Sequence, residues 1–320
     1  MSQHFLISPA ARSLSIAQVL RLSDEEAYAT FRRVRFAANG GEPFCPHCGA
    51  VKVYTLAETP IRWKCSGCRH KFSVTSGTLF HSRKLAIRDH LAVIALFCNG
   101  LKGVAALHMA RDMNINPKSA FVLLHKLRQA MGATLGGEEL AGEVEIDGAY
   151  FGRGPKQANR KADRPGRRTL DIERQVVVVA RERHGDARTW VVGKEADAVP
   201  MIRANVASGA EVHADESGAW NILLASYPMK RVNHSVEYKG EDGACTNQAE
   251  SYFSRLRRCE FGIHHRISGH RLQAYADEMA WRENHRRQPN GTHWNLITAA
   301  ALAHPKSATW AGYWHREKAA

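Results

Sequence analysis

Hydrophobic spacing divides the first 132 residues into helical stretches on both sides of a small strand-rich segment. Apolar residues recur at helical spacing over 13–38, and this pattern ends at Asn39-Gly40-Gly41. Residues 44–80 are rich in Cys, Gly and β-branched residues, which predicts short strands. Helical spacing then returns in three stretches, 85–97, 104–113 and 118–131, and a linker follows at 132–142.

From Glu143 the period changes to the alternation typical of strands. Strands are predicted at 144–150, 176–180, 189–192, 211–215 and 230–232, and helices at 196–206, 247–259 and 270–287. The run Val176-Val177-Val178-Val179 is apolar throughout, which is typical of a strand buried on both faces. Strands followed by alternating helices and strands indicate an α/β or α+β domain with a mixed sheet.

The charge balance indicates what kind of molecule the protein binds. Lys plus Arg number 45 against 31 Asp plus Glu, so the formal charge is +14 and the pI is near 9.7. Such an excess attracts polyanions, of which nucleic acid is the commonest. An anionic membrane is the rival partner, but no strongly amphipathic basic helix is present, and we expect no membrane association.

Neither a signal peptide nor a membrane span is expected. The N-terminus lacks the charged start and apolar centre of a secretion signal, and the longest apolar run, Leu91–Cys98, is too short to cross a bilayer. Four of the seven cysteines fall in two tight pairs, which is typical of a metal site in a reducing compartment. A cytoplasmic, nucleoid-associated protein is the expectation.

The two cysteine pairs have the spacing C-x2-C-x16-C-x2-C and consist of Cys45, Cys48, Cys65 and Cys68. Each pair places two thiolates on one tight turn, as a tetrahedral Zn²⁺ requires, with Gly49 and Gly67 permitting the turns. Four thiolates fill the coordination shell, so the predicted zinc is structural and not catalytic. His47 and His70 lie nearby and are expected at the surface.

Residues 102–131 fit a helix-turn-helix. Asn116 can cap the second helix and Pro117 suits its first position. The apolar residues Ala120, Leu123, Leu124 and Leu127 share one face. Lys118, Ser119, His125 and Arg128 are then expected to face a DNA groove. The alternative is a helical hairpin that packs and recognises nothing.

Three carboxylates stand at the ends of predicted elements. Asp147 and Asp215 each follow an apolar strand, and Glu250 begins a helix, with 67 and 34 residues in the two intervals. Mg²⁺ prefers hard oxygen ligands, and two such ions commonly serve phosphodiester cleavage. Arg257 lies seven residues beyond Glu250, on nearly the same helical face, where a cation can hold a DNA phosphate.

Other assignments of these acids stay open. A single Asp at a strand end is usually a cap or turn residue. Glu145 and Glu216 lie close enough to be confused with the chosen residues, and a salt-bridge role stays open for either. Their exchange for Gln is expected to have a milder effect on activity than exchange of the chosen acids.

Taken together, these motifs resemble the transposases of the insertion sequence 1595 family. The catalytic part carries EVEIDGAYFGRG, VHADESGAW, VNHSVEY and TNQAESYFSRLRRCEFGIHHRISGH, and the front end carries FCPHCG and WKCSGCRHKFSVTSGTLFHSRKL. The resemblance covers about residues 15–290 in the same order. It implies a DNA transposase of the DDE type with an RNase H-like catalytic fold.

The resemblance also implies roles for residues. Asp147, Asp215 and Glu250 are the expected metal ligands, and Arg257 stands where the family usually carries Lys. Some members are described with Asn in the third catalytic role, so Asn247 is the second choice behind Glu250. His234 lies between Asp215 and Glu250 and either lines the site or is a structural, hydrogen-bonded residue.

Two basic stretches flank the predicted metal site in sequence. Residues 152–174 carry eight Lys or Arg, from which Arg160, Lys161, Arg167 and Arg168 are predicted to bind DNA backbone. The second cluster, Arg255, Arg257, Arg258, Arg266 and Arg271, follows the predicted third ligand. Charge runs of this kind are often only solvated surface.

The expected architecture is therefore multidomain. It comprises an N-terminal helical segment (1–43), a zinc ribbon (44–83), a helix-turn-helix (84–135), an RNase H-like domain with a mixed sheet flanked by helices (140–290) and a C-terminal tail (291–320). The expected function is Mg²⁺-dependent cleavage and strand transfer of double-stranded DNA, by a homo-oligomer assembled on DNA. The rivals are a DNA-binding regulator with a relic catalytic domain and a structure-specific nuclease.

Overall fold

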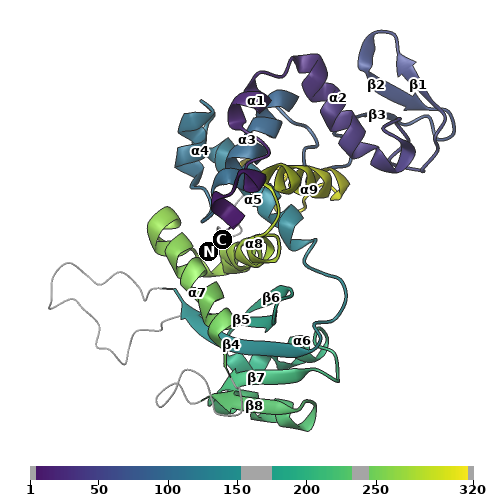
Figure 1. Cartoon of the computed structure of the whole chain (residues 1–320). Helices are drawn as coiled ribbons and strands as arrows, with labels where there is room; N and C mark the ends of the chain where they lie inside the picture. Colours follow the sequence, from purple (N-terminus) through teal and green to yellow (C-terminus); the bar gives the residue numbers. More distant parts are fainter. Residues whose placement is uncertain (1–4, 153–174, 233–244, 316–320) are drawn as a thin grey trace. The chain divides into compact units, whose positions relative to one another are not determined.

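The computed structural model describes residues 5–152, 175–232 and 245–315, and the chain divides into two compact units. Unit 1 consists of Met1–Thr134 together with Arg286–Ala320, and unit 2 consists of Leu135–His285. Figure 1 shows their elements, coloured along the sequence. The end of the chain thus returns to the unit in which the chain began.

Unit 1 is mainly helical. Its helices are α1 (Ile16–Leu20), α2 (Asp24–Arg35), α3 (Ile87–Asn99), α4 (Ala106–Asp112), α5 (Pro117–Gly132) and α9 (Asn290–Ala303), with short turns η1 (Phe5–Ile7), η2 (Pro9–Ala11), η3 (Ala37–Asn39) and η9 (Tyr313–His315). Capping explains two of the starts. The Ser15 and Ser23 side chains accept from the backbone N–H groups of Gln18 and Glu26, each at 3.1 Å, and α1 and α2 begin directly afterwards.

Helix α3 forms the centre of unit 1 and contacts α1, α2 and α9. It contains the apolar run Leu91–Cys98, nearly all of which is buried. The indole N–H of Trp294 in α9 donates to the carbonyl of Leu91 at 2.9 Å. Among the described helices, none is long and apolar enough to cross a membrane.

Helix α9 lies in the segment that the sequence pattern predicts to be a tail, and that prediction is corrected. The buried residues of α9 include Trp294, Ile297, Ala301 and Leu302. The backbone N–H of Leu79 donates to the carbonyl of Ala301 at 3.3 Å. The helix is stabilised by packing against α2, α3 and α5, with a weak amphipathic pattern of its own. This explains why periodicity alone misses it.

Unit 2 contains a five-stranded mixed sheet in the order β6-β5-β4-β7-β8. The strands are β4 (Glu143–Phe151), β5 (Gln175–Glu182), β6 (Ala187–Val192), β7 (Glu211–Asp215) and β8 (Met229–Val232). Strands β6, β5 and β4 pair antiparallel, whereas β4, β7 and β8 pair parallel. The mixed sheet expected from the sequence is confirmed.

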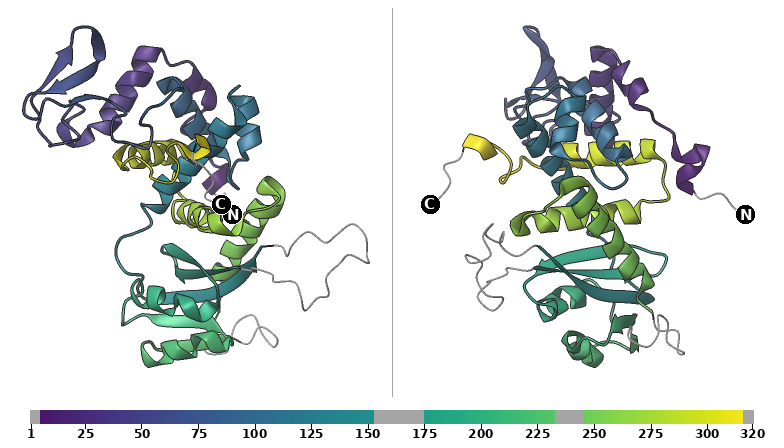
Figure 2. Two further views of the ribbon diagram at one scale, coloured as in Figure 1. Left: turned by 180° about the vertical axis from the view of Figure 1, so that it is seen from behind. Right: turned by 90° about the vertical axis from the view of Figure 1, so that its left-hand side faces the viewer.

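Helices and turns cover both faces of this sheet (Figure 2). They are η5 (Glu195–Ala198), α6 (Val199–Arg203), η6 (Gly218–Ala225), α7 (Asn247–Cys259), the π-helical turn η7 (Glu260–His264), η8 (Gly269–Arg271) and α8 (Leu272–Asn284). Val144 and Ile146 of β4 pack with η5, α6 and η6 in one core. Ala149 and Phe151 pack with α7 and α8 in the other.

A carboxylate of α8, Asp277, makes the stability of unit 2 depend on pH. Burial raises the pKa of Asp277 to about 6, while hydrogen bonds from Gln273 (2.7 Å) and Thr189 (3.1 Å) oppose the shift. A carboxyl whose pKa is raised on folding stabilises the native state at low pH, and this contribution is lost as pH rises through about 6. We predict that Asp277→Asn, which can still accept both bonds, flattens the pH dependence of the free energy of unfolding between about pH 4 and about pH 7. Urea titrations of the variant and of the wild type across this pH range measure the free energy of unfolding. The two proteins are expected to differ by on the order of 1 kcal/mol at neutral pH.

Candidate catalytic and metal sites

Asp147 and Asp215 lie at corresponding positions of two adjacent parallel strands. The register pairs Val144 with Val212 and Ile146 with Ala214, so the two aspartates are the next residues in both strands. Neighbouring strands lie about 4.8 Å apart. Because Val144 and Ile146 belong to the core on one face, alternation directs Asp147 to the α7 face.

Backbone and side-chain donors orient both aspartates. The backbone N–H of Gly148 donates to Asp147 Oδ1 at 2.7 Å. Asp215 Oδ1 accepts from the Trp220 indole at 2.9 Å and from the backbone of Ser217 at 3.1 Å. Trp220 itself is fully buried, so the Asp215 carboxylate is held by a rigid core residue.

Helix α7 brings Glu250 to the same place. Its apolar side, which includes Ala249, Phe253 and Leu256, is buried against the sheet and α8. Asn247, Glu250 and Arg257 are exposed and recur at helical spacing. The face proposed from the sequence is therefore an exposed face of the helix.

Three other carboxylates lie near enough to Asp147 to affect its pKa. Burial raises the pKa of Asp147 to about 7, and the negative charges of Asp215, Glu250 and Glu195 raise it further, against the hydrogen bond from Gly148. A group in this environment holds a proton or a cation more readily than an ordinary aspartate. Of these carboxylates, Glu195 is absent from the set predicted from the sequence.

The donor set fits divalent cations. All the oxygens are hard ligands of the kind Mg²⁺ prefers. Asp147, Asp215 and Glu250 do not form one of the described groups whose ligand atoms all lie within 4.8 Å of one another.

The salt-bridge role left open for Glu145 is confirmed by its pair with Arg183 at 3.0 Å, and the structure adds a second role that the sequence does not show. It is fully buried, and its Oε2 accepts from the backbone N–H groups of Gln248 (2.7 Å) and Ala249 (3.1 Å) at the start of α7. Thr246, the residue preceding α7, makes no side-chain cap of its own. Glu145 therefore caps α7 from β4, two residues before Asp147 on the same face, and the expectation that its exchange is mild is revised.

A second acidic group lies at the opposite end of β4 and β7. Glu143, Glu211 and His213 have ligand atoms within 4.8 Å of one another. Cations of the protein already neutralise them: Arg183 pairs with Glu143 and with Glu145 (3.0 Å), and Lys230 pairs with Glu211 (2.8 Å). This group is an ion-pair network, and no metal is needed to balance it.

The four cysteines of unit 1 form a compact cluster. The small sheet β1 (Val53–Leu56), β2 (Thr59–Cys65) and β3 (Lys71–Ser73) is antiparallel and supports the second pair. The Sγ atoms of Cys45 and Cys68, and of Cys48 and Cys65, lie 3.6 Å apart, and all four lie within 4.8 Å. Four sulfurs at about 2.3 Å from a tetrahedral ion are about 3.8 Å apart, so the cluster fits Zn²⁺. His47 and His70 are exposed beside it, as expected.

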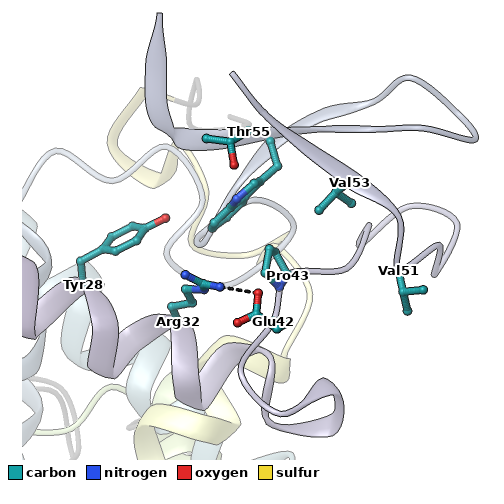
Figure 3. Close-up of a pocket in the computed structure, with 8 residues that line it drawn as sticks. Tyr28, Arg32, Glu42, Pro43, Val51, Val53 and Thr55 are labelled. Atoms are coloured by element: carbon teal, nitrogen blue, oxygen red, sulfur yellow. Dashed lines mark hydrogen bonds and ion pairs between the residues drawn. The ribbon is translucent and has the colours of Figure 1, made fainter. Parts of the chain in front are cut away.

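A hollow of about 300 Å³ lies between α2 and the ribbon (Figure 3). Arg32 and Glu42 form an ion pair of 2.5 Å within it, and Tyr28 and the buried Trp63 stack on one another with centroids 6.4 Å apart. The hollow is lined by Tyr28, Arg32, Glu42, Pro43, Val51, Val53, Thr55 and Trp63. It contains none of the metal-ligating groups described above.

Helix α5 corrects part of the predicted DNA-binding surface. Lys118 and Ser119, at its start, are exposed. His125 is fully buried and stacks on Trp310 with centroids 4.3 Å apart, and Arg128 is 2% exposed with its guanidinium 5.7 Å from the centre of the Phe97 ring. These two side chains pack inside unit 1 and do not face a DNA groove.

Several predicted residues fall outside the described ranges. These are Arg160, Lys161, Arg167 and Arg168 of the first basic stretch, together with His234. Their roles stay predictions.

Comparison with known proteins agrees with the resemblance read from the sequence. Residues 139–284 match the model of the ISXO2-like transposase domain, and residues 22–71 match that of the transposase zinc-ribbon domain. Among curated proteins none matches the chain. A solved structure with similarity is that of the Mos1 Strand Transfer Complex, at 9% identity and a TM-score of 0.25, covering 66% of this chain and 78% of that chain.

The two domain matches define a transposase with a zinc ribbon in front of its catalytic domain. The chain belongs to the insertion sequence 1595 family of transposases.

Proposed function

We propose that the protein is a DDE transposase that binds the ends of its element and catalyses Mg²⁺-dependent DNA cleavage and strand transfer. One observation carries the proposal: the parallel register of β4 and β7 sets Asp147 beside Asp215, and α7 adds Glu250 to the same carboxylate cluster. The strand order, with three antiparallel strands followed by two parallel ones, supports an RNase H-like fold.

In this proposal the three carboxylates hold two Mg²⁺ ions, which supply activation of the nucleophile and stabilisation of the leaving oxygen. Gly148 N–H and the Trp220 indole keep the aspartate oxygens oriented, so little reorganisation accompanies the reaction. Arg257, exposed two turns after Glu250, holds a phosphate of the DNA backbone. Its Lys-to-Arg difference from the family keeps the charge and changes the geometry.

The front end is proposed to recognise the DNA. Helices α4 and α5 are joined by a turn in which Asn114 has a φ of +48°, and the Asn116 side chain accepts from the backbone N–H of Lys118 at 2.9 Å. This supports a helix-turn-helix whose second helix enters the major groove with its first turn only. Double-stranded DNA is the partner, with the protein acting as a homo-oligomer, and a chromosomal substrate implies a cytoplasmic, nucleoid-associated location.

Lys118 and Ser119 provide the prediction for this surface. Their combined exchange for Ala is expected to weaken binding to an element end about tenfold, since each contact of the recognition helix contributes on the order of 1 kcal/mol. Arg128→Ala is the contrasting variant, expected to lower the melting temperature because the residue is buried. Fluorescence anisotropy with a labelled end and thermal melting separate the two effects. Equal loss of binding in a fully folded Arg128→Ala protein would contradict the assignment.

The zinc prediction concerns Cys45, Cys48, Cys65 and Cys68. Native mass spectrometry is expected to find one zinc per chain, and Cys65→Ser is expected to lose it, because three thiolates leave the tetrahedral shell incomplete. Cys98→Ser, at a buried cysteine outside the cluster, is the control and should retain the metal. A folded wild-type protein without zinc would contradict the prediction.

A reaction with labelled element ends and target DNA tests the function itself. Joined product is the expected result. Cleavage without joining would instead favour a structure-specific nuclease, and binding without cleavage a DNA-binding regulator.

A further inference from the structure

Glu195 is a carboxylate at the catalytic cluster that comes from the opposite face of the sheet from Glu250. It begins η5, whose residue Ala198 lies in the core shared with β4 and α6. The side chain reaches back to Gly148: a Cβ at that glycine would lie 2.8 Å from Glu195 Cγ and from Oε1. The missing side chain directly after Asp147 therefore provides the space that Glu195 occupies.

Ser217 connects Glu195 to the other catalytic aspartate. Its hydroxyl donates to Glu195 Oε2 at 2.8 Å, and its backbone N–H donates to Asp215 Oδ1 at 3.1 Å. The Gly148 backbone, against which Glu195 packs, donates to Asp147 at 2.7 Å. Glu195 is thus attached to the residues that orient both aspartates.

Two structural explanations of Glu195 are weak. Capping of η5 is already supplied by Asp197, whose carboxylate accepts from the backbone of Lys194 at 2.9 Å. An ion pair is the second explanation, but within the described residues no Lys or Arg forms one with Glu195, in contrast to Glu143, Glu145 and Glu211. Within the part of the chain that the structure describes, this partly buried carboxylate beside two aspartates therefore has no Lys or Arg to balance its charge.

We propose that Glu195 is a fourth carboxylate ligand of the catalytic metal site. The inference rests on the proposed function, because it adds a ligand to the same site. It also gives a reason for the sequence Asp147-Gly148: any larger residue after the aspartate would displace Glu195. Glu195 then adds a carboxylate from the face of the sheet opposite to the one that carries α7 and Glu250.

Mn²⁺ binding to the full-length, DNA-free protein tests the proposal without relying on activity. Isothermal titration and the EPR signal of free Mn²⁺ give affinity and stoichiometry. Glu195→Gln is expected to weaken the affinity of at least one site about tenfold or more, or to remove that site, while the melting temperature stays near wild type. Gly148→Ala is expected to give the same loss, since its Cβ displaces the Glu195 carboxylate.

Glu216→Gln is the matched control, because it removes the same charge from an exposed position next to Asp215. It should bind Mn²⁺ like wild type. If Glu195→Gln and Gly148→Ala both bind Mn²⁺ with wild-type affinity while Asp147→Asn binds it clearly more weakly, the proposed role of Glu195 is overturned and the metal site itself is not. Wild-type binding in Asp147→Asn would contradict the proposed metal site itself.

Discussion

Exchanging Asp147, Asp215 or Glu250 for its amide is expected to abolish DNA cleavage and strand transfer, by more than about 10³-fold, while DNA binding is retained. The amide keeps the shape of the side chain and loses the charge that holds a cation. The transition state at phosphorus then lacks its counter-charge. Removing a negative charge should, if anything, tighten binding to the polyanion. Single-turnover cleavage of labelled ends, with anisotropy for binding, measures both quantities.

Glu216→Gln serves as the control here, being exposed and adjacent to Asp215. Its activity is expected to stay within a few-fold of wild type, because the charge of an exposed side chain is screened by solvent and salt. Ca²⁺ is expected to support binding but not chemistry, because its looser coordination misplaces the nucleophile. If Glu250→Gln stays active while Asn247→Ala is inactive, the third ligand is Asn247 and the assignment of Glu250 is wrong.

Glu145→Ala is expected to cost unit 2 about 3 kcal/mol or more of its free energy of unfolding. The substitution removes a fully buried carboxylate that accepts two backbone N–H groups of α7 and pairs with Arg183 at 3.0 Å. It leaves the start of α7 without its cap, and the guanidinium of Arg183 loses one of its carboxylate partners. Because α7 carries Glu250, activity should fall together with stability.

Glu143→Ala is the matched comparison for that substitution. Glu143 also pairs with Arg183, but its side chain is 48% exposed, so its loss is expected to cost less than about 1 kcal/mol. Chemical denaturation of both variants gives the two values. Equal destabilisation would mean that the ion pair with Arg183, and not the cap on α7, accounts for the effect.

Local signals made much of the fold predictable. Strand alternation located β4, capping residues located α5, and helical spacing located α7 with its bounds at 247 and 259. The spacing of the cysteines identified a cluster that the geometry supports. In each case the signal is contained within a short stretch of chain, so no knowledge of tertiary packing is needed.

The errors have a common physical origin, since each depends on contacts between distant segments. Helix α9 is stabilised by burial against α3, and His125 is buried because Trp310, far along the chain, stacks on it. The composition of a local stretch does not show which distant segments of the chain will pack over it. Periodicity on α5 separated one apolar face correctly, but it did not show that the opposite side is also covered.

The approach of Glu195 to the site and the capping of α7 by Glu145 were missed for the same reason. Glu195 begins the short turn η5 and carries no motif, and it is related to the site through its approach to Gly148 and its hydrogen bond from Ser217. Glu145 did give a signal, because it alternates with Asp147 and so shares its face. What it contacts on that face depends on where α7 begins.

Anomalous scattering from crystals soaked in Mn²⁺ tests the central claim most directly. The account predicts manganese at the ends of β4 and β7, coordinated by Asp147 and Asp215, with a Glu250 oxygen at the site when element-end DNA is bound. The zinc edge should give a separate peak among the four cysteines. Manganese at Glu143, Glu211 and His213, with none at the aspartates, would contradict the assignment of the catalytic site.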